Sequence, residues 1–286
     1  MNVRTVKQLF KENLGVFYTP NELSQITYWV LEECLQTDRI DLMLNPLQNL
    51  TDKQQKKIEK IMSQLAKHQP IQYILGKAEF MDLELRVNKS VLIPRPETED
   101  LVHWITEIYW QQAQNPLRIL DIGTGSGCIA LALKNAFPQA EVWASDIDEK
   151  ALTVAEKNAQ KNKLSVSFVQ NDITQKENWL RDQTWDIMVS NPPYIPYAEQ
   201  FLMSANTAFE PEKALFVPDA DPLLFYRTIA EFALKNLSPE GKLFFELNEN
   251  YAQTTQALLQ KMGFREVVLH KDLQEKYRML VASLHQ

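Results

Sequence analysis

Glycine is scarce in this chain and is concentrated at one place. The sequence contains 7 glycines in 286 residues, where average usage would give roughly 20. Three of them, Gly123, Gly125 and Gly127, follow an apolar segment at 118–122 and precede a helical pattern. Glycine adopts backbone conformations that other residues avoid. The spacing therefore predicts a sharp turn between a strand and a helix, with the main chain close to a bound ligand.

Strand and helix patterns alternate from Leu117 to the C-terminus. We predict strands at 118–122, 142–144, 166–169, 187–189, 242–246, 265–270 and 278–282, with helices at 129–133, 150–160, 222–237 and 251–262. Such alternation predicts an α/β fold with a mostly parallel sheet covered on both faces. Residues 271–277 are too few for a crossover helix, so the last strand should run antiparallel to its neighbour.

The N-terminal part, residues 1–75, reads as helices only. Thr19 begins a helix with capping-box spacing, residues 50–54 begin another, and apolar residues follow both at helical intervals. We expect a small all-α bundle that recognises the substrate. A hairpin linker should follow at 76–96, where apolar residues approach two-residue alternation, and a second domain should cover 97–286.

Composition excludes several classes of protein. Hydrophobic residues make up 45% and charged residues 23%, as in ordinary globular proteins. The 30 basic and 37 acidic residues give a net charge of −7, which disfavours stable binding of nucleic acid. Two cysteines make no disulfide framework, and the N-terminus has no signal-peptide core. No apolar run is long enough to cross a bilayer. We expect a cytoplasmic protein without membrane contact.

Acidic residues follow three successive predicted strands. A dinucleotide fingerprint would have a third glycine at the position of Cys128, so pyrophosphate binding is disfavoured. Asp121 suits a cationic amino group, and Asp146 is spaced to accept hydrogen bonds from ribose hydroxyls. Asp172 and Ile173 are placed to edge an adenine. Each acid alone could instead cap a helix or turn, but together they indicate a ligand site at the carboxyl edge of the sheet.

The predicted strand at 187–189 leads into Asn191-Pro192-Pro193-Tyr194. The two prolines remove two backbone donors, so nearby carbonyls are free to accept hydrogen bonds. Asn191 adds a side-chain acceptor and Tyr194 a flat wall. The turn is suited to an –NH₂ group on a planar, conjugated carbon. The alternative is an ordinary surface turn, which its place at a strand end after the glycine turn makes a poor explanation.

Together these motifs resemble the S-adenosylmethionine-dependent methyltransferases that methylate amino groups. Further segments resemble the family of peptide-chain release factor glutamine methyltransferases over nearly the whole chain: 69–76, 79–80, 91–99, 209–211, 214–215 and 271–273. The resemblance implies a Rossmann-like seven-stranded sheet with an antiparallel last strand. It also implies S-adenosylmethionine as methyl donor, no metal, and methylation of the glutamine amide in the Gly-Gly-Gln loop of bacterial class-1 release factors. The sequence departs from the family's pattern where glycines are lost, at 217–223, at Asn248 and at Glu275 or a neighbour.

The resemblance also implies the roles of individual residues. The acceptor nitrogen should be held by Asn191, Pro192, Pro193 and Tyr194, and Arg95 should shape the substrate entrance. The donor should be bound by Asp121, Gly123, Thr124, Gly125, Ser126, Gly127, Asp146, Asp172, Ile173 and Asn191. We expect a monomer.

Four alternatives remain at this point. The same turn serves adenine or guanine amino-methyltransferases acting on nucleic acid, which the acidic balance disfavours. A glutamine methyltransferase for a ribosomal protein would share all of the chemistry. A noncatalytic donor-binding module would have no use for the Asn-Pro-Pro-Tyr turn. A nicotinamide dehydrogenase is disfavoured by Cys128.

Overall fold

The computed structural model describes residues 1–176, 183–272 and 274–285. Leu273, part of one segment compared above, lies outside the described residues. The chain forms two compact units. One contains Met1–Gly76 together with Ser204–Phe209, and the other contains Lys77–Met203 with Glu210–Gln286. The hairpin at the start of the second unit therefore belongs to its compact body. The use of the first unit for substrate recognition stays a prediction.

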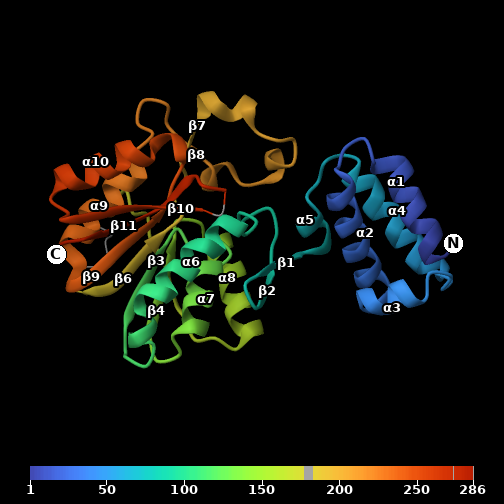
Figure 1. Ribbon diagram of the computed structural model, residues 1–286, viewed down its shortest axis with the longest axis horizontal. Helices are drawn as coiled ribbons and strands as arrows, with labels where there is room; N and C mark the ends of the chain where they lie inside the picture. Colours follow the sequence, from blue (N-terminus) through green and yellow to red (C-terminus); the bar gives the residue numbers. More distant parts are fainter. Residues whose placement is uncertain (177–182, 273, 286) are drawn as a thin grey trace. The chain divides into compact units, whose positions relative to one another are not determined.

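The first unit is built from helices, as Figure 1 shows. They are α1 (Val3–Leu14), α2 (Pro20–Leu35), α3 (Arg39–Leu44), α4 (Asp52–Leu65) and α5 (Ile71–Leu75). The predicted capping box forms, with Thr19 accepting a hydrogen bond from the Glu22 amide, and the structure adds a second one in which Thr51 accepts from the Gln54 amide. The apolar stripes of α1, α2 and α4 meet in one core around Phe10, Leu31 and Leu65.

The second unit opens with a short hairpin. Strands β1 (Lys77–Phe80) and β2 (Leu83–Arg86) pair antiparallel and bury alternate side chains, as the two-residue alternation predicts. Pro96 is the first residue of α6 (Pro96–Tyr109), where the fixed φ of proline suits a helix start. The Pro94-Arg95-Pro96 segment thus separates hairpin from helix and brings Arg95 beside the sheet.

A seven-stranded sheet forms the centre of this unit. Its order is β10-β11-β9-β6-β3-β4-β5. The strands are β3 (Arg118–Ile122), β4 (Glu141–Asp146), β5 (Ser167–Gln170), β6 (Trp185–Ser190), β9 (Leu237–Glu246), β10 (Glu266–Lys271) and β11 (Tyr277–Ser283). β11 runs antiparallel to both neighbours, and the remaining pairs are parallel. The α/β class and the antiparallel last strand are therefore confirmed.

Helices cover both faces of the sheet (Figure 1). α6, α7 (Cys128–Ala136) and α8 (Glu149–Asn162) pack on one face, and α9 (Leu224–Asn236) and α10 (Ala252–Met262) on the other. Neighbouring residues of β3 point to opposite cores: Ile119 belongs to the first and Leu120 to the second. Such two-sided burial explains why the strands read as continuous apolar runs.

Short elements lie between the main strands and helices, and one of them, Thr207–Phe209, belongs to the first unit. Between β6 and α9 lie β7 (Ile195–Pro196), paired in parallel with β8 (Phe216–Val217), and 3₁₀ turns at Tyr197–Leu202, Thr207–Phe209 and Glu212–Ala214. Others follow α6 at Trp110–Gln112 and β9 at Glu249–Tyr251.

Within residues 1–176, 183–272 and 274–285, we find no helix with the length and apolar character to cross a membrane. β3, β4, β5 and β6 are parallel, so their carboxyl ends share one edge of the sheet.

Candidate active site

A cavity of about 420 Å³ opens at this edge. The turn after β3, the ends of β4 and β6, the residues after β5 and the segment before α6 all contribute to its walls. The structure brings most of the predicted site residues into the lining: Arg95, Gly123, Thr124, Gly125, Ser126, Asp146, Asp172, Ile173, Asn191, Pro192 and Pro193. Asp121, Gly127 and Tyr194 lie behind the lining rather than in it.

The glycine turn divides into two functions. Gly123 (φ +77°) and Gly125 (φ +54°) line the cavity, and a Cβ atom on either would meet nothing within 4 Å. Gly127 (φ +83°) instead lies against α8, where its Cβ would come within 3.1 Å of the Ala155 Cβ. The first two glycines thus shape the cavity, and the third allows two helices to pack closely.

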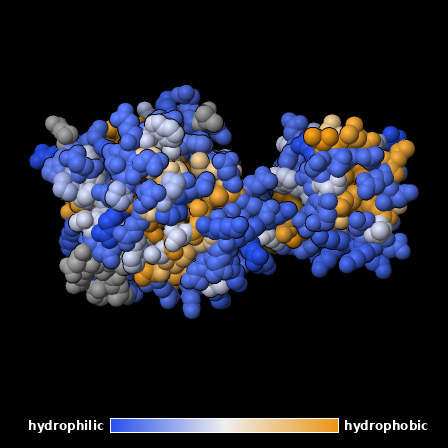
Figure 2. All heavy atoms as spheres, turned by 90° about the horizontal axis from the view of Figure 1, so that it is seen from below, coloured by the Kyte–Doolittle hydropathy of each residue, from blue (hydrophilic) through white to orange (hydrophobic). Residues whose placement is uncertain are grey.

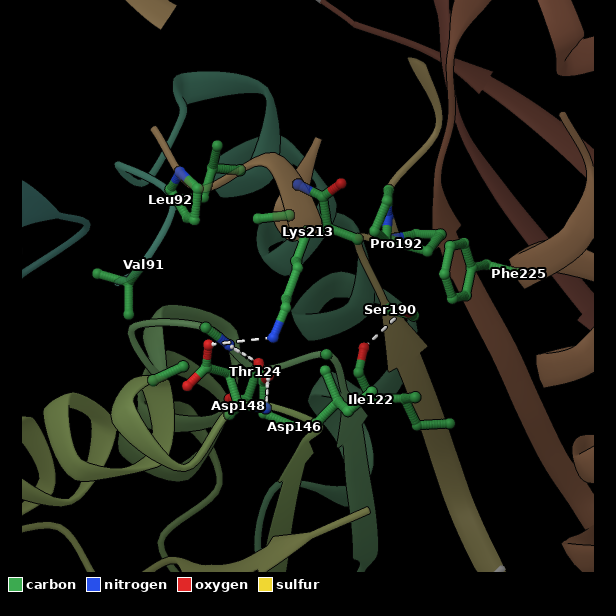
Figure 3. A pocket seen from close by; sticks show the side chains of 18 of the residues that line it. Val91, Leu92, Ile122, Thr124, Asp146, Asp148, Ser190, Pro192, Lys213 and Phe225 are labelled. Carbon is green, nitrogen blue, oxygen red and sulfur yellow. Dashed lines mark hydrogen bonds and ion pairs between the residues drawn. The ribbon is translucent and has the colours of Figure 1, made fainter. Parts of the chain in front are cut away.

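Asp146 holds the glycine turn in place. Its Oδ2 accepts a hydrogen bond from the Gly125 amide and its Oδ1 one from the Asp148 amide, both at 2.9 Å. An ionised carboxylate has about four acceptor positions, so each oxygen keeps capacity for a hydroxyl donor. Lys213 reaches into the cavity from the opposite wall, with its Nζ 3.9 Å from Asp148 Oδ2 (Figure 3).

Three buried oxygen atoms around the cavity have no hydrogen-bond partner among the described residues. They are Asp121 Oδ1, Ser126 Oγ and Asn171 Oδ1. Ser126 and Asn171 line the cavity directly, beside the apolar side chains of Ile147 and Ile173. Buried polar groups in native proteins are normally paired. The site therefore fits a ligand with hydroxyl and ammonium donors on one side and a flat apolar group on the other.

Asp121 lies fully buried beneath the turn. Its Oδ2 accepts hydrogen bonds from the Thr124 hydroxyl at 2.6 Å and from the Ala130 amide at 3.2 Å. Burial raises its pKa to about 7, against the lowering effect of these two bonds. A ligand cation near the turn would stabilise the ionised form.

We expect Asp121→Asn to change how stability depends on pH when no ligand is bound. The pKa of Asp121 is higher in the folded protein than in the unfolded chain, so unfolding releases its proton between pH values of about 4 and 7. The free energy of unfolding should fall as pH rises through this window. Asp121→Asn should make that slope shallower by up to about 1.4 kcal/mol per pH unit. Urea unfolding at several pH values measures how the free energy of unfolding depends on pH. If Asp121→Asn left that slope unchanged, the raised pKa of Asp121 would be contradicted.

The Asn-Pro-Pro-Tyr turn follows directly from β6. The Ser190 hydroxyl donates to the Ile122 carbonyl at 2.6 Å and joins the ends of β6 and β3 (Figure 3). Asn191 Nδ2 donates to Thr98 Oγ1 at 3.3 Å, while the structure shows no partner for Asn191 Oδ1 among the described residues. Pro192 lies beside Phe225 in the cavity wall. Asn191 therefore presents an acceptor oxygen at this wall, as an incoming –NH₂ group requires.

The guanidinium of Arg95 is engaged by a buried carboxylate. Its Nη2 donates to both oxygens of Glu210, at 2.6 and 2.8 Å, and the Glu210 side chain is 2% exposed. This pair ties the segment before α6 to the segment before β8 across the cavity wall. The role of Arg95 at a substrate entrance stays a prediction, and the structure adds that Glu210 holds it there.

Several residues at the site were not singled out from the sequence. Thr98 and Lys213 line the cavity, and Glu246 lies behind it with an oxygen 2.6 Å from the Thr98 hydroxyl. Glu246 ends a predicted strand and Thr98 lies in the segment at 91–99, so a signal was present for both. These segments indicated a likeness to the family. They did not indicate that Thr98 and Glu246 are in contact, because no sequence spacing rule pairs residues 148 positions apart.

The fold and the site define this chain as an α/β methyltransferase. Residues 105–217 match the family model described as the methyltransferase small domain, and residues 14–76 match the PrmC N-terminal domain. The release factor glutamine methyltransferase of Flavobacterium psychrophilum is 42% identical over 98% of both chains. That of Bacteroides thetaiotaomicron is 41% identical over 96% of this chain and 97% of its own. The chain belongs to the release factor glutamine methyltransferase family.

Solved structures agree on the fold. The hMettl16 catalytic domain in complex with MAT2A 3'UTR hairpin 1 is 16% identical with a TM-score of 0.59, over 93% of this chain and 92% of that chain. A methyltransferase from Pyrococcus furiosus is 18% identical with a TM-score of 0.52, over 82% of this chain and 100% of that chain. At such identities the likeness establishes the architecture alone, because one fold serves many substrates.

Proposed function

We propose that this protein transfers a methyl group from S-adenosylmethionine to the side-chain amide nitrogen of the glutamine in the Gly-Gly-Gln loop of a peptide-chain release factor. The Asn191 amide carries the proposal. Its Nδ2 is engaged by Thr98, and its Oδ1 remains as an acceptor at the cavity wall. The names of the relatives support the same substrate. So does the prediction that the Asn-Pro-Pro-Tyr turn holds the –NH₂ group that receives the methyl.

The donor fits the cavity by its pattern of polar and apolar groups. Asp146 would accept from the ribose hydroxyls, and Asp172 and Ile173 would border the adenine. Ser126, Asn171 and the buried Asp121 offer oxygen atoms that lack donors among the described residues, which suits the amino-acid end of the donor. When bound, the donor supplies an electrophilic methyl group on a sulfonium.

The acceptor nitrogen is a weak nucleophile because its lone pair is conjugated with the amide carbonyl. Asn191 Oδ1 and the Pro192 carbonyl would each accept one of its N–H bonds. These two contacts would fix its orientation and increase the electron density on nitrogen. Catalysis would then rest on positioning and on fixed dipoles. No histidine lines the described part of the cavity, and the surplus proton can leave after transfer.

We further infer that the helical unit contacts the release factor. We also infer that the protein acts as a monomer. Figure 2 shows apolar side chains gathered over part of the surface of this unit. α3 and the residue stretch after it expose Ile40, Met43, Leu44 and Leu47, each more than 60% accessible. Exposed apolar groups at this density are typical of protein-binding surfaces.

Substitutions on α3 should weaken recognition of the release factor without affecting the donor site. Ile40 and Leu44 lie one helical turn apart, so Ile40→Ser and Leu44→Ser remove apolar contact area from one face. Each should raise the KM for the release factor about tenfold, with kcat and donor affinity retained. Trp110→Ser, at a residue that is 71% exposed in the other unit, is the matched control. Equal KM values for all three variants would contradict the assignment.

Transfer of a labelled methyl group from S-adenosylmethionine tests the proposed function. Unmethylated release factor, the same factor with its Gly-Gly-Gln glutamine replaced, bulk tRNA and DNA are offered in parallel. Label should enter the release factor and be lost when that glutamine is replaced. Label on nucleic acid alone would overturn the substrate while leaving the fold and the donor in place.

A further inference from the structure

A buried carboxylate lies directly behind the Asn-Pro-Pro-Tyr turn. Glu246 ends β9 and is 3% exposed, and Thr98, in the first turn of α6, is 2% exposed. The Thr98 hydroxyl donates to Glu246 Oε2 at 2.6 Å, and the Tyr194 hydroxyl lies 3.5 Å from Oε1. One carboxylate therefore contacts Tyr194, interacts with the Asn191 side chain, and also reaches Asn191 through Thr98.

The chemistry of these groups gives the chain of hydrogen bonds a direction. An ionised carboxylate can only accept, so the Thr98 hydroxyl proton must point to Glu246. The Thr98 oxygen is then an acceptor toward Asn191, whose Nδ2 lies 3.3 Å away. The amide of Asn191 consequently turns its nitrogen to Thr98 and its oxygen to the other side.

We propose that Glu246, both directly and through Thr98, orients the Asn191 amide so that its oxygen faces the acceptor nitrogen of the substrate. Thr98 and Glu246 are positioning residues for methyl transfer. A reversed amide would present N–H donors to an incoming –NH₂ group, which itself brings donors. This inference rests on the function proposed above.

Further hydrogen bonds hold the arrangement from behind. The Tyr226 hydroxyl donates to the Glu246 carbonyl at 3.3 Å, and Asn248 Nδ2 donates to the Tyr194 carbonyl at 3.4 Å. These bonds restrain both Glu246 and the Asn-Pro-Pro-Tyr turn. The reactive geometry is thus supported by side chains from α9 and from the residues that follow β9.

The direction of the hydrogen bonds from Asn191 through Thr98 to Glu246 depends on whether Glu246 is ionised. Burial raises its pKa to about 7 and the charge of Glu97 raises it further, while hydrogen bonds from Thr98 and Asn191 and the charge of Arg278 lower it. The titratable groups interacting with it also include Cys128, Tyr194 and Tyr226. Once protonated, the carboxyl can donate to Thr98 and release the constraint on Asn191. The ionised form should therefore be the active one, with kcat rising as pH increases through about 7.

Two substitutions at Thr98 separate its hydroxyl from its packing. Thr98→Val keeps the shape and loses the hydroxyl, and Thr98→Ser keeps the hydroxyl and loses the methyl group. With full-length protein and release factor, kcat should fall about 10- to 100-fold in Thr98→Val. Thr98→Ser should keep kcat within about threefold. Donor affinity, measured by calorimetry, should be the same in both. In Glu246→Gln, the rise of kcat with pH near 7 should disappear.

The opposite pattern would overturn the inference. A packing role predicts that Thr98→Val behaves as wild type while Thr98→Ser is impaired, and a structural role predicts equal loss of donor affinity and turnover. A pH profile that Glu246→Gln leaves unchanged would also overturn it. Wild-type protein without activity on the release factor would instead refute the proposed function, so the two failures are distinguishable.

Discussion

Asn191→Ala should reduce kcat for methylation of the release factor about a hundredfold to a thousandfold, the usual cost of losing a preorganised dipole at a reacting group. The substitution removes the acceptor that orients the substrate nitrogen and leaves Thr98 without its donor. Donor affinity should stay within about threefold, because the glycine turn and Asp146 are untouched. Steady-state kinetics with calorimetric titration of the donor measures both quantities.

A second asparagine serves as the control for this substitution. Asn162 ends α8, and its side chain donates to carbonyl oxygens of the helix and of β2 outside the cavity. Asn162→Ala should leave kcat unchanged. Turnover that survives in Asn191→Ala, or that falls equally in Asn162→Ala, would refute the role given to Asn191.

Gly123→Ala should have its effect on donor binding. The added Cβ projects into open space that belongs to the cavity, where it would displace the donor. We expect the Kd for S-adenosylmethionine to rise at least about tenfold. The positive φ of +77° adds a strain of about 1 kcal/mol for any residue with a Cβ atom.

Gly263→Ala serves as a control that separates backbone strain at positive φ from blockage of the donor cavity by the added Cβ. Gly263 ends α10 with a φ of +109°, and a Cβ there also meets nothing within 4 Å, but the residue does not line the cavity. Both variants should lose similar stability in thermal unfolding, and only Gly123→Ala should lose donor affinity. A Kd unchanged in Gly123→Ala would show that the donor lies elsewhere.

The elements that could be predicted from the sequence are those that short segments determine. A capping box needs four residues, and the one predicted at Thr19 forms as expected. The glycine turn and the Asn-Pro-Pro-Tyr turn follow strands whose burial on both faces makes them plain in the sequence. α3 and α5 span only 6 and 5 residues, too few for a helical period to stand out.

Contacts between distant segments could not be predicted in the same way. Arg95 meets Glu210 across 115 positions, and Thr98 meets Glu246 across 148. Only the parallel arrangement of the sheet and the placement of α6 bring these residues together. The sequence marked their segments as family motifs, but the pairing depends on tertiary structure.

Two of the lost family glycines have structural explanations. The Asn248 side chain makes two hydrogen bonds that glycine could not make: it accepts from the Asn250 amide and donates to the Tyr194 carbonyl. Glu275 adopts a φ of +64°, a conformation that glycine enters without strain. If the family's glycine falls at this position, the left-handed backbone at Glu275 is the conformation that it would serve.

The methyl group is expected on one particular nitrogen, the side-chain amide nitrogen of the release-factor glutamine. Release factor should be incubated with the wild-type protein and S-adenosylmethionine, digested, and sequenced by tandem mass spectrometry. We expect a single methyl group on the side-chain nitrogen of the Gly-Gly-Gln glutamine, and in the same time at least about a hundredfold less of it with Asn191→Ala. A methyl group on another residue, or an unmodified glutamine beside an active enzyme, would contradict it.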